Sequence, residues 1–130
     1  MIYAEISAEL SANEINTILK DEDALVIDFN FITSELELKL AEQLTISSFK
    51  QKNNIANKFK YEFLLWVSGK RDIKSAMEVT LPKSNKMIIV VFGTNYRKIL
   101  SQLNPKVIKK KLPKIFDSIA LERISTSRVF

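Results

Sequence analysis

The chain has 130 residues, with 20 basic and 15 acidic side chains and neither cysteine nor histidine. Lacking both residue types, it cannot form disulfides, thiolate or imidazole zinc sites, or the usual nucleophile–base pairs of enzymes. Carboxylate, lysine or tyrosine catalysis remains open, but only five acids follow residue 49. We therefore expect a binding protein without enzymatic activity, bound metal or cofactor.

The hydrophobic fraction of 46% is typical of a folded globular chain, and the length suits a single domain over residues 1–130. The longest apolar run, at residues 87–93, is much shorter than the roughly 18 residues that span a membrane. The acidic N-terminus does not resemble a secretory signal. We expect a soluble cytoplasmic protein with no membrane partner.

Four elements are predicted before residue 50. Residues 2–6 alternate in hydrophobicity as an outer strand does, and residues 24–29 are typical of a buried strand. Ser11 and Glu14 have the spacing of a capping box, which predicts a short helix to about residue 20. A second helix is predicted from residue 33 or 34 to about residue 47. Its leucines recur every four residues, at Leu36, Leu40 and Leu44.

The middle of the chain predicts two helices separated by a glycine. Residues 57–68 contain so many apolar and aromatic side chains that this helix is expected to be buried on nearly all sides. Gly69 suits the left-handed position that ends such a helix. A shorter helix is expected from about residue 71 to residue 80, with Asp72 in its first turn. Its predicted inward-facing side chains are Ile73, Ala76 and Met77.

Residues 86–92 are the clearest predicted strand, and a helix follows from Thr94 or Asn95 to Leu103. The basic segment 104–114 predicts a turn of helix broken by a proline, which can also open the final helix. The side chains expected on one side of that helix are Ile115, Phe116, Ile119, Ala120 and Ile124. Together these elements predict an α+β fold, with a small antiparallel sheet of about three or four strands packed with about six helices.

Charge is unevenly distributed along the chain. Residues 1–49 contain ten acids and two lysines, whereas residues 50–130 contain eighteen bases and five acids. This asymmetry favours a basic half that faces a polyanion and an acidic half that faces away or binds another protein. The alternative is that acids and bases pair across the folded surface.

Three basic groups are candidates for polyanion binding. Lys58 and Lys60 lie at the start of the predicted 57–68 helix, and Lys70 and Arg71 follow its end. The third group consists of Lys106, Lys109, Lys110, Lys111 and Lys114. Each group has the alternative interpretation of ordinary solvated lysines.

The stretch Ser68-Gly69-Lys70-Arg71, here called the Gly69 corner, has a further property. It precedes a helix, so backbone N–H groups without intrahelical partners are expected to point outward beside two cations. That combination suits a nucleic-acid phosphate. A nearby aromatic, Tyr61 or Trp66, could stack an unpaired base, although aromatics in such a helix are more often part of the core.

The residues around this corner form a wider pattern. Asparagine, phenylalanine, glutamate and leucine precede Ser-Gly, and isoleucine and alanine follow it. The positions are Asn57, Phe59, Glu62, Leu64, Ser68, Gly69, Ile73 and Ala76. This pattern resembles the middle motif of the kinase-binding subunit of the KEOPS complex, in its archaeal form. Similarity continues, in order, through the strand at 87–92, the segment 95–99 and the terminal helix at 119–122.

Two departures from the family pattern stand out. Asp72 occupies a position where the family usually has an amide, and Thr80-Leu81-Pro82 occupies a region where a glycine is common. The first departure affects any interaction that uses the amide as a donor. An aspartate can nevertheless serve the start of a helix.

The resemblance implies a noncatalytic subunit with two partners. One is the atypical kinase/ATPase of KEOPS, and the other is the 3′ CCA end of tRNA, for installing threonylcarbamoyladenosine. The residues that it suggests for RNA contact are Lys58, Lys60, Ser68, Gly69, Lys70 and Arg71. Ile124, Val129 and Phe130 are apolar candidates for the kinase interface, with a frayed tail as the alternative. No small-molecule substrate is expected.

Two other functions remain open from the sequence. One is a free-standing RNA-binding or protein-adaptor domain without KEOPS. The other is an unusual enzyme that uses carboxylates or lysines.

Overall fold

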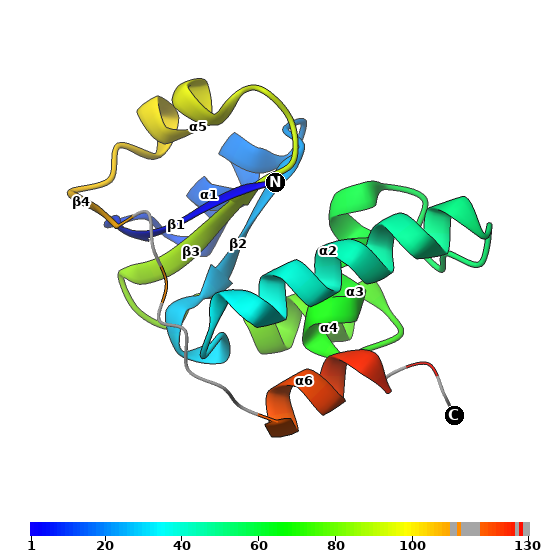
Figure 1. Cartoon of the computed structure of the whole chain (residues 1–130). Coiled ribbons are helices and arrows are strands. Elements are labelled where there is room, and N and C mark those ends of the chain that lie inside the picture. Colours follow the sequence, from blue (N-terminus) through cyan, green and yellow to red (C-terminus); the bar gives the residue numbers. More distant parts are fainter. Residues whose placement is uncertain (110–111, 113–117, 127, 129–130) are drawn as a thin grey trace. The chain divides into compact units, whose positions relative to one another are not determined.

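A computed structural model describes residues 1–109, 112, 118–126 and 128. These residues fall into two compact units, shown with their elements in Figure 1. Unit 1 spans Met1–Phe31 and Leu81–Leu112, and unit 2 spans Ile32–Thr80 and Pro113–Phe130. Within the described ranges, no helix is long and apolar enough to cross a membrane. The predicted α+β fold is confirmed, and the single domain over residues 1–130 stays a prediction.

Unit 1 is built on one antiparallel sheet with strand order β2-β3-β1-β4. Its elements are β1 (Ile2–Ser7), α1 (Ala12–Leu19), β2 (Ala24–Asp28), the 3-10 turn η1 (Phe29–Phe31), β3 (Lys86–Val91), α5 (Tyr96–Leu103) and β4 (Val107–Lys109). The predicted capping box is confirmed, because Ser11 Oγ accepts from the Glu14 amide and Glu14 Oε1 accepts from the Ser11 amide. Two helices and three of the four strands lie within a few residues of their predicted positions.

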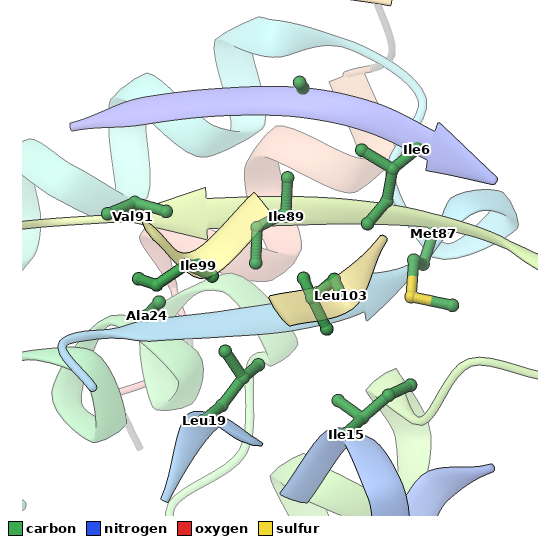
Figure 2. Close-up of a cluster of buried hydrophobic side chains, with 10 residues drawn as sticks. Ile6, Ile15, Leu19, Ala24, Met87, Ile89, Val91, Ile99 and Leu103 are labelled. Atoms are coloured by element: carbon green, nitrogen blue, oxygen red, sulfur yellow. The ribbon is translucent and has the colours of Figure 1, made fainter. Parts of the chain in front are cut away.

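The buried side chains in the core cluster of unit 1 are all aliphatic apart from one methionine (Figure 2), and the partly buried Tyr96 packs against them. In the sheet, Ile89 of β3 lies between Ala4 of β1 and Val26 of β2. Helices α1 and α5 pack on this face through apolar side chains. The buried members of the cluster are Ala4, Ile6, Ile15, Leu19, Ala24, Met87, Ile89, Val91, Ile99 and Leu103. Burial of apolar area thus accounts for the cohesion of this unit.

Two predictions for unit 1 were wrong. Strand β1 is not an outer strand, because it pairs with β3 on one side and β4 on the other. The alternation of apolar and polar side chains in β1 shows which of its residues face α1 and α5. It does not show whether the strand lies at the edge or inside the sheet. The basic segment 104–114 was expected to form a turn of helix, but it contains the strand β4. Val107 and Ile108 are β-branched and favour a strand, and Lys109 lies opposite Glu5 of β1.

Unit 2 is helical, with α2 (Glu35–Lys50), α3 (Phe59–Ser68), α4 (Ile73–Thr80) and α6 (Ser118–Ser125). Helix α3 packs against α2, α4 and α6, and α6 also packs against α2. The prediction that α3 is buried on nearly all sides is confirmed, since every residue from Glu62 to Ser68 is buried. Gly69 ends α3 in the left-handed conformation, with φ of 73°, as the sequence predicted.

The inward faces of the other three helices differ in part from prediction. Leu36 of α2, Ile73 and Met77 of α4 and Ile119 of α6 are exposed, Ile119 to 78%. The buried positions of α2 include Leu38, Ala41, Thr45 and Ser48. On α4, Ala76 is buried as predicted, together with Thr80, and on α6 Ala120 and Ile124 are buried as predicted. Ile115 and Phe116 lie outside the described residues. Small and hydroxyl side chains occupy many of the buried positions. The buried hydroxyl groups are satisfied within their own helix, because Thr45 and Thr80 donate hydrogen bonds to backbone oxygens of the preceding turn.

Candidate nucleic-acid interface

The helix that carries the candidate site is anchored by a buried carboxylate. Glu62 of α3 is fully buried and accepts four hydrogen bonds. The amides of Ile55 and Ala56 donate to Oε1 at 3.0 and 2.9 Å. Ser48 Oγ and Arg128 Nη1 donate to Oε2 at 2.7 and 2.6 Å. Burial raises the pKa of Glu62, but the bonds from Arg128, Ala56 and Ser48 outweigh it and leave the pKa below its ordinary value.

Arg128 also fixes the only tryptophan of the chain. Its guanidinium lies 3.9 Å from the centroid of the Trp66 ring, which is an attractive cation–π arrangement. Trp66 is buried, with 8% of its surface exposed. The suggested role of Trp66 as a stacking platform for a base does not fit this arrangement. Tyr61 is half-buried and lies 5.2 Å from the Lys60 ammonium.

A second buried carboxylate lies at the start of α2. Glu37 Oε2 accepts from the Thr33 amide, the Thr33 hydroxyl and the Ser34 amide at 2.7, 2.7 and 2.9 Å. Its other oxygen, Oε1, accepts from Arg123 Nη2 of α6 at 2.9 Å. Both fully buried glutamates of unit 2 are therefore paired with arginines of the C-terminal segment.

The Gly69 corner has a defined internal geometry. The Gly69 amide donates to the carbonyls of Leu65 and Trp66 at 3.0 and 3.2 Å. The Lys70 amide donates to Ser68 Oγ at 3.2 Å, and Ser68 Oγ donates to the Leu65 carbonyl. These two amides were expected to point outward as free donors, and that expectation was wrong. They close the helix end, as amides just beyond a left-handed cap commonly do.

Asp72 directly precedes α4 instead of lying inside its first turn. Its Oδ2 accepts from the Ser75 amide at 2.8 Å, which is the hydrogen bond of an N-cap residue. That bond lowers the pKa of Asp72. Asp72, at the position where the family that the motif resembles usually has an amide side chain, therefore caps the start of α4. Its carboxylate accepts the capping hydrogen bond.

Gly69 is half-buried, and the other five candidate RNA-binding residues divide into two groups. Lys58, Lys70 and Arg71 are exposed, Lys58 immediately before α3 and the other two just beyond it. Lys60 and Ser68 are buried, with 5% and 3% of their surface exposed. A direct contact of these two side chains with RNA does not fit their burial. Lys60 points inward because α3 is surrounded on nearly all sides, which the charge of the side chain alone did not reveal.

Two arginines and one lysine were missed by the sequence reasoning. Arg123 and Arg128 stand out only once the buried glutamates are known, although a glutamate inside the apolar run of α3 was a usable signal. Lys74 is exposed on α4, one turn after Arg71. It extends the positive surface of the corner.

Acids and bases pair across the surface of unit 1. Lys98 bonds to Glu22 at 3.2 Å, Lys106 to Glu9 at 2.9 Å, and Lys109 lies 3.8 Å from Glu5. The alternative interpretation of the charge asymmetry therefore accounts for part of it. Lys110, Lys111 and Lys114 of the third basic group lie outside the described residues.

The candidate partner residues have different outcomes. Ile124 is fully buried against the rest of unit 2, so it does not form a contact surface. It was expected to be incompletely covered, but it lies on the inner side of α6 beside Arg123. Val129 and Phe130 lie outside the described residues. Within those residues, no cluster of three acidic side chains is close enough to hold a metal ion.

Comparisons with known proteins add no family. Neither the scan against models of protein families nor the search of curated proteins finds a match to this chain.

Proposed function

We propose that this chain is a noncatalytic binding subunit of the KEOPS type, which binds the complex's kinase/ATPase and the unpaired 3′ end of tRNA. The observation that carries the proposal is the exposure of Lys58, Lys70 and Arg71 at the two ends of α3. The helix spans roughly 15 Å at 1.5 Å per residue. A tail of three or four nucleotides reaches both ends, whereas a single phosphate does not.

The resembling motif also has physical roles that suit a rigid binding platform. Glu62 fixes the start of α3, Gly69 ends it, and Ala76 is fully buried on α4. Rigid presentation of cations lowers the entropy cost of binding a flexible RNA end. Asp72 caps α4 as an acceptor, so this proposal assigns it no hydrogen bond to RNA.

The RNA part is tested by filter binding of tRNA with and without its CCA end. Removal of the CCA end should weaken binding more than any single lysine substitution, because base interactions disappear together with phosphates. Arg71→Ala should weaken binding and make the salt dependence shallower, by about 0.7 unit for each phosphate that is no longer neutralised. If tRNA without CCA binds equally well, the corner is not the site, and the basic segment 106–114 becomes the better candidate.

The kinase part requires a contact residue, and Ile119 of α6 is an exposed apolar candidate. Ile119 is exposed to 78%, whereas Ala120 and Ile124 of the same helix face inward. We expect Ile119→Glu to reduce co-elution with the kinase/ATPase in gel filtration and to leave the fold intact. Exposed Met77→Glu on α4 serves as the control. Binding of tRNA without any binding of the kinase would instead support a free-standing RNA-binding domain.

A further inference from the structure

Gly69 is in close contact with one residue of α6. A Cβ atom placed on Gly69 would lie 2.8 Å from Cγ of Arg123, 3.2 Å from its backbone oxygen and 3.6 Å from its Cδ. The aliphatic stem of Arg123 therefore packs directly on the glycine backbone. This is the turn that carries the exposed Lys70 and Arg71.

The guanidinium end of Arg123 is held as firmly as its stem. Nη2 donates to Oε1 of Glu37 at 2.9 Å, and Glu37 is fully buried. The other carboxylate oxygen already accepts three hydrogen bonds from Thr33 and Ser34, so the carboxylate has a fixed orientation. Arg123 thus links a fixed point at the start of α2 to the turn at the end of α3.

We propose that Arg123 is a positioning residue for the Gly69 corner, which sets the direction in which Lys70 and Arg71 project. A glycine with φ of 73° has no side chain of its own to limit its backbone. The stem of Arg123 supplies that limit from outside, because the ion pair with Glu37 holds it against the glycine. The consequence for RNA rests on the proposed function, whereas the effect on the backbone does not.

The sharpest variant removes the ionic anchor and keeps the packing volume. Arg123→Met alone would leave Glu37 buried without its cation and can unfold the protein. The pair Glu37→Gln/Arg123→Met removes both charges, retains an acceptor for Thr33 and Ser34, and leaves an unbranched stem near Gly69. Arg123→Lys, with Glu37 unchanged, keeps the anchor and is the rescue variant. Lys39→Ala removes an ion pair elsewhere on α2 whose lysine is exposed, and it is the control.

The first measurement is amide hydrogen exchange without RNA. We expect exchange of residues 69–73 to accelerate in the Glu37→Gln/Arg123→Met variant and to remain near the wild-type rate in Arg123→Lys and Lys39→Ala. Amides of β3 in unit 1 should be unchanged in all variants. Unaltered exchange at 69–73 in the double variant would overturn the proposal.

The second measurement is tRNA binding in a double-mutant cycle. The double variant should bind about two- to thirtyfold more weakly, the range expected for residues that act through another site. Adding Lys70→Ala and Arg71→Ala together should cost little more than the larger of the two separate effects, because Arg123 acts through these two residues. Fully additive effects would mean that Arg123 contacts RNA itself, which also overturns the proposal. If the wild type binds no tRNA, the proposed function fails and the exchange result alone decides this inference.

Discussion

The two units of this protein are stabilised in different ways. The core cluster of unit 1 contains only apolar side chains, and the lysines in the ion pairs of its described residues are largely exposed. In the Lys106–Glu9 pair both side chains are about two-thirds exposed. Unit 2 buries Glu37 and Glu62 completely and pairs each with an arginine. Apolar burial is non-directional, whereas buried ion pairs require particular partners at particular distances. Unit 2 is therefore the more specifically assembled unit and the more sensitive to loss of one group.

The largest effect is expected for Glu62→Ala. This change leaves Arg128 and two backbone amides without their acceptor in a buried site. We expect the free energy of unfolding to fall by about 3–5 kcal/mol, the range for breaking a buried pair. Urea denaturation measures it, with Lys39→Ala, which removes an exposed cation of α2, as the control. A change below about 1 kcal/mol, typical of surface pairs, would remove the distinction between the units.

A substitution in the core of unit 1 tests whether that unit is stabilised by apolar burial. Ile89→Ala removes a fully buried side chain from the middle strand of the cluster in Figure 2. We expect a loss of about 2–5 kcal/mol from transfer and cavity terms, and only about 0.5–1.5 kcal/mol for Ile89→Val. The loss should be nearly the same at low and high salt, because the change removes no charge. Strong salt dependence would contradict a purely apolar core.

Gly69→Ala is expected to have an intermediate effect. The left-handed conformation costs a non-glycine residue about 1–2 kcal/mol, and the new methyl group would meet Arg123. Differential scanning calorimetry should show a lower Tm. Gly93→Ala is the matched control, because the nearest heavy atom to its Cβ, Asp23 Cβ, would lie at an ordinary 3.8 Å. Equal effects at both glycines would show that the packing of Arg123 on Gly69 is unimportant.

Acid should weaken unit 2 through Glu62. The pKa of Glu62 is lowered in the folded protein, so its contribution is full above its ordinary value of about 4.3 and is lost as pH falls through the lowered pKa. Amide exchange of α3, measured from pH 6 downward, should accelerate relative to β3 after correction for intrinsic rates. The Glu62→Gln variant should lose most of this pH dependence. If the pH dependence of α3 exchange were unchanged in Glu62→Gln, the acid effect would have to come from other carboxylates.

The smallest effect is expected for the exposed pair of unit 1. Lys106→Ala removes the ion pair with Glu9, in which both side chains are largely exposed. We expect a change in unfolding free energy of at most about 1 kcal/mol, and less at high salt. Urea denaturation at two salt concentrations measures it. A loss as large as that of Glu62→Ala would mean that surface charge holds unit 1 together.

Elements with a strong local signal were predicted from the sequence. The capping box at Ser11 and Glu14, the β-branched strand β3, the apolar helix α3 and its glycine stop depend on residues within a few positions of one another. The stereochemistry of such short segments is largely set by the residues themselves. The sequence also placed Lys58 near the start of α3 and Lys70 and Arg71 beyond its end, and these three side chains are exposed.

Only the tertiary structure decided which polar groups meet. Arg128 is 66 residues from Glu62, and Arg123 is 86 residues from Glu37, so no local pattern connects them. The inward turn of Lys60, the pairing of β4 with β1 and the exposure of Ile119 likewise depend on neighbours distant in the chain. The amino-acid sequence by itself determined which helices and strands form and which residues cap the helices. Long-range packing and charge pairing determined which face of each element is buried. The reason is that the native arrangement minimises the free energy of the whole folded chain rather than that of any one segment.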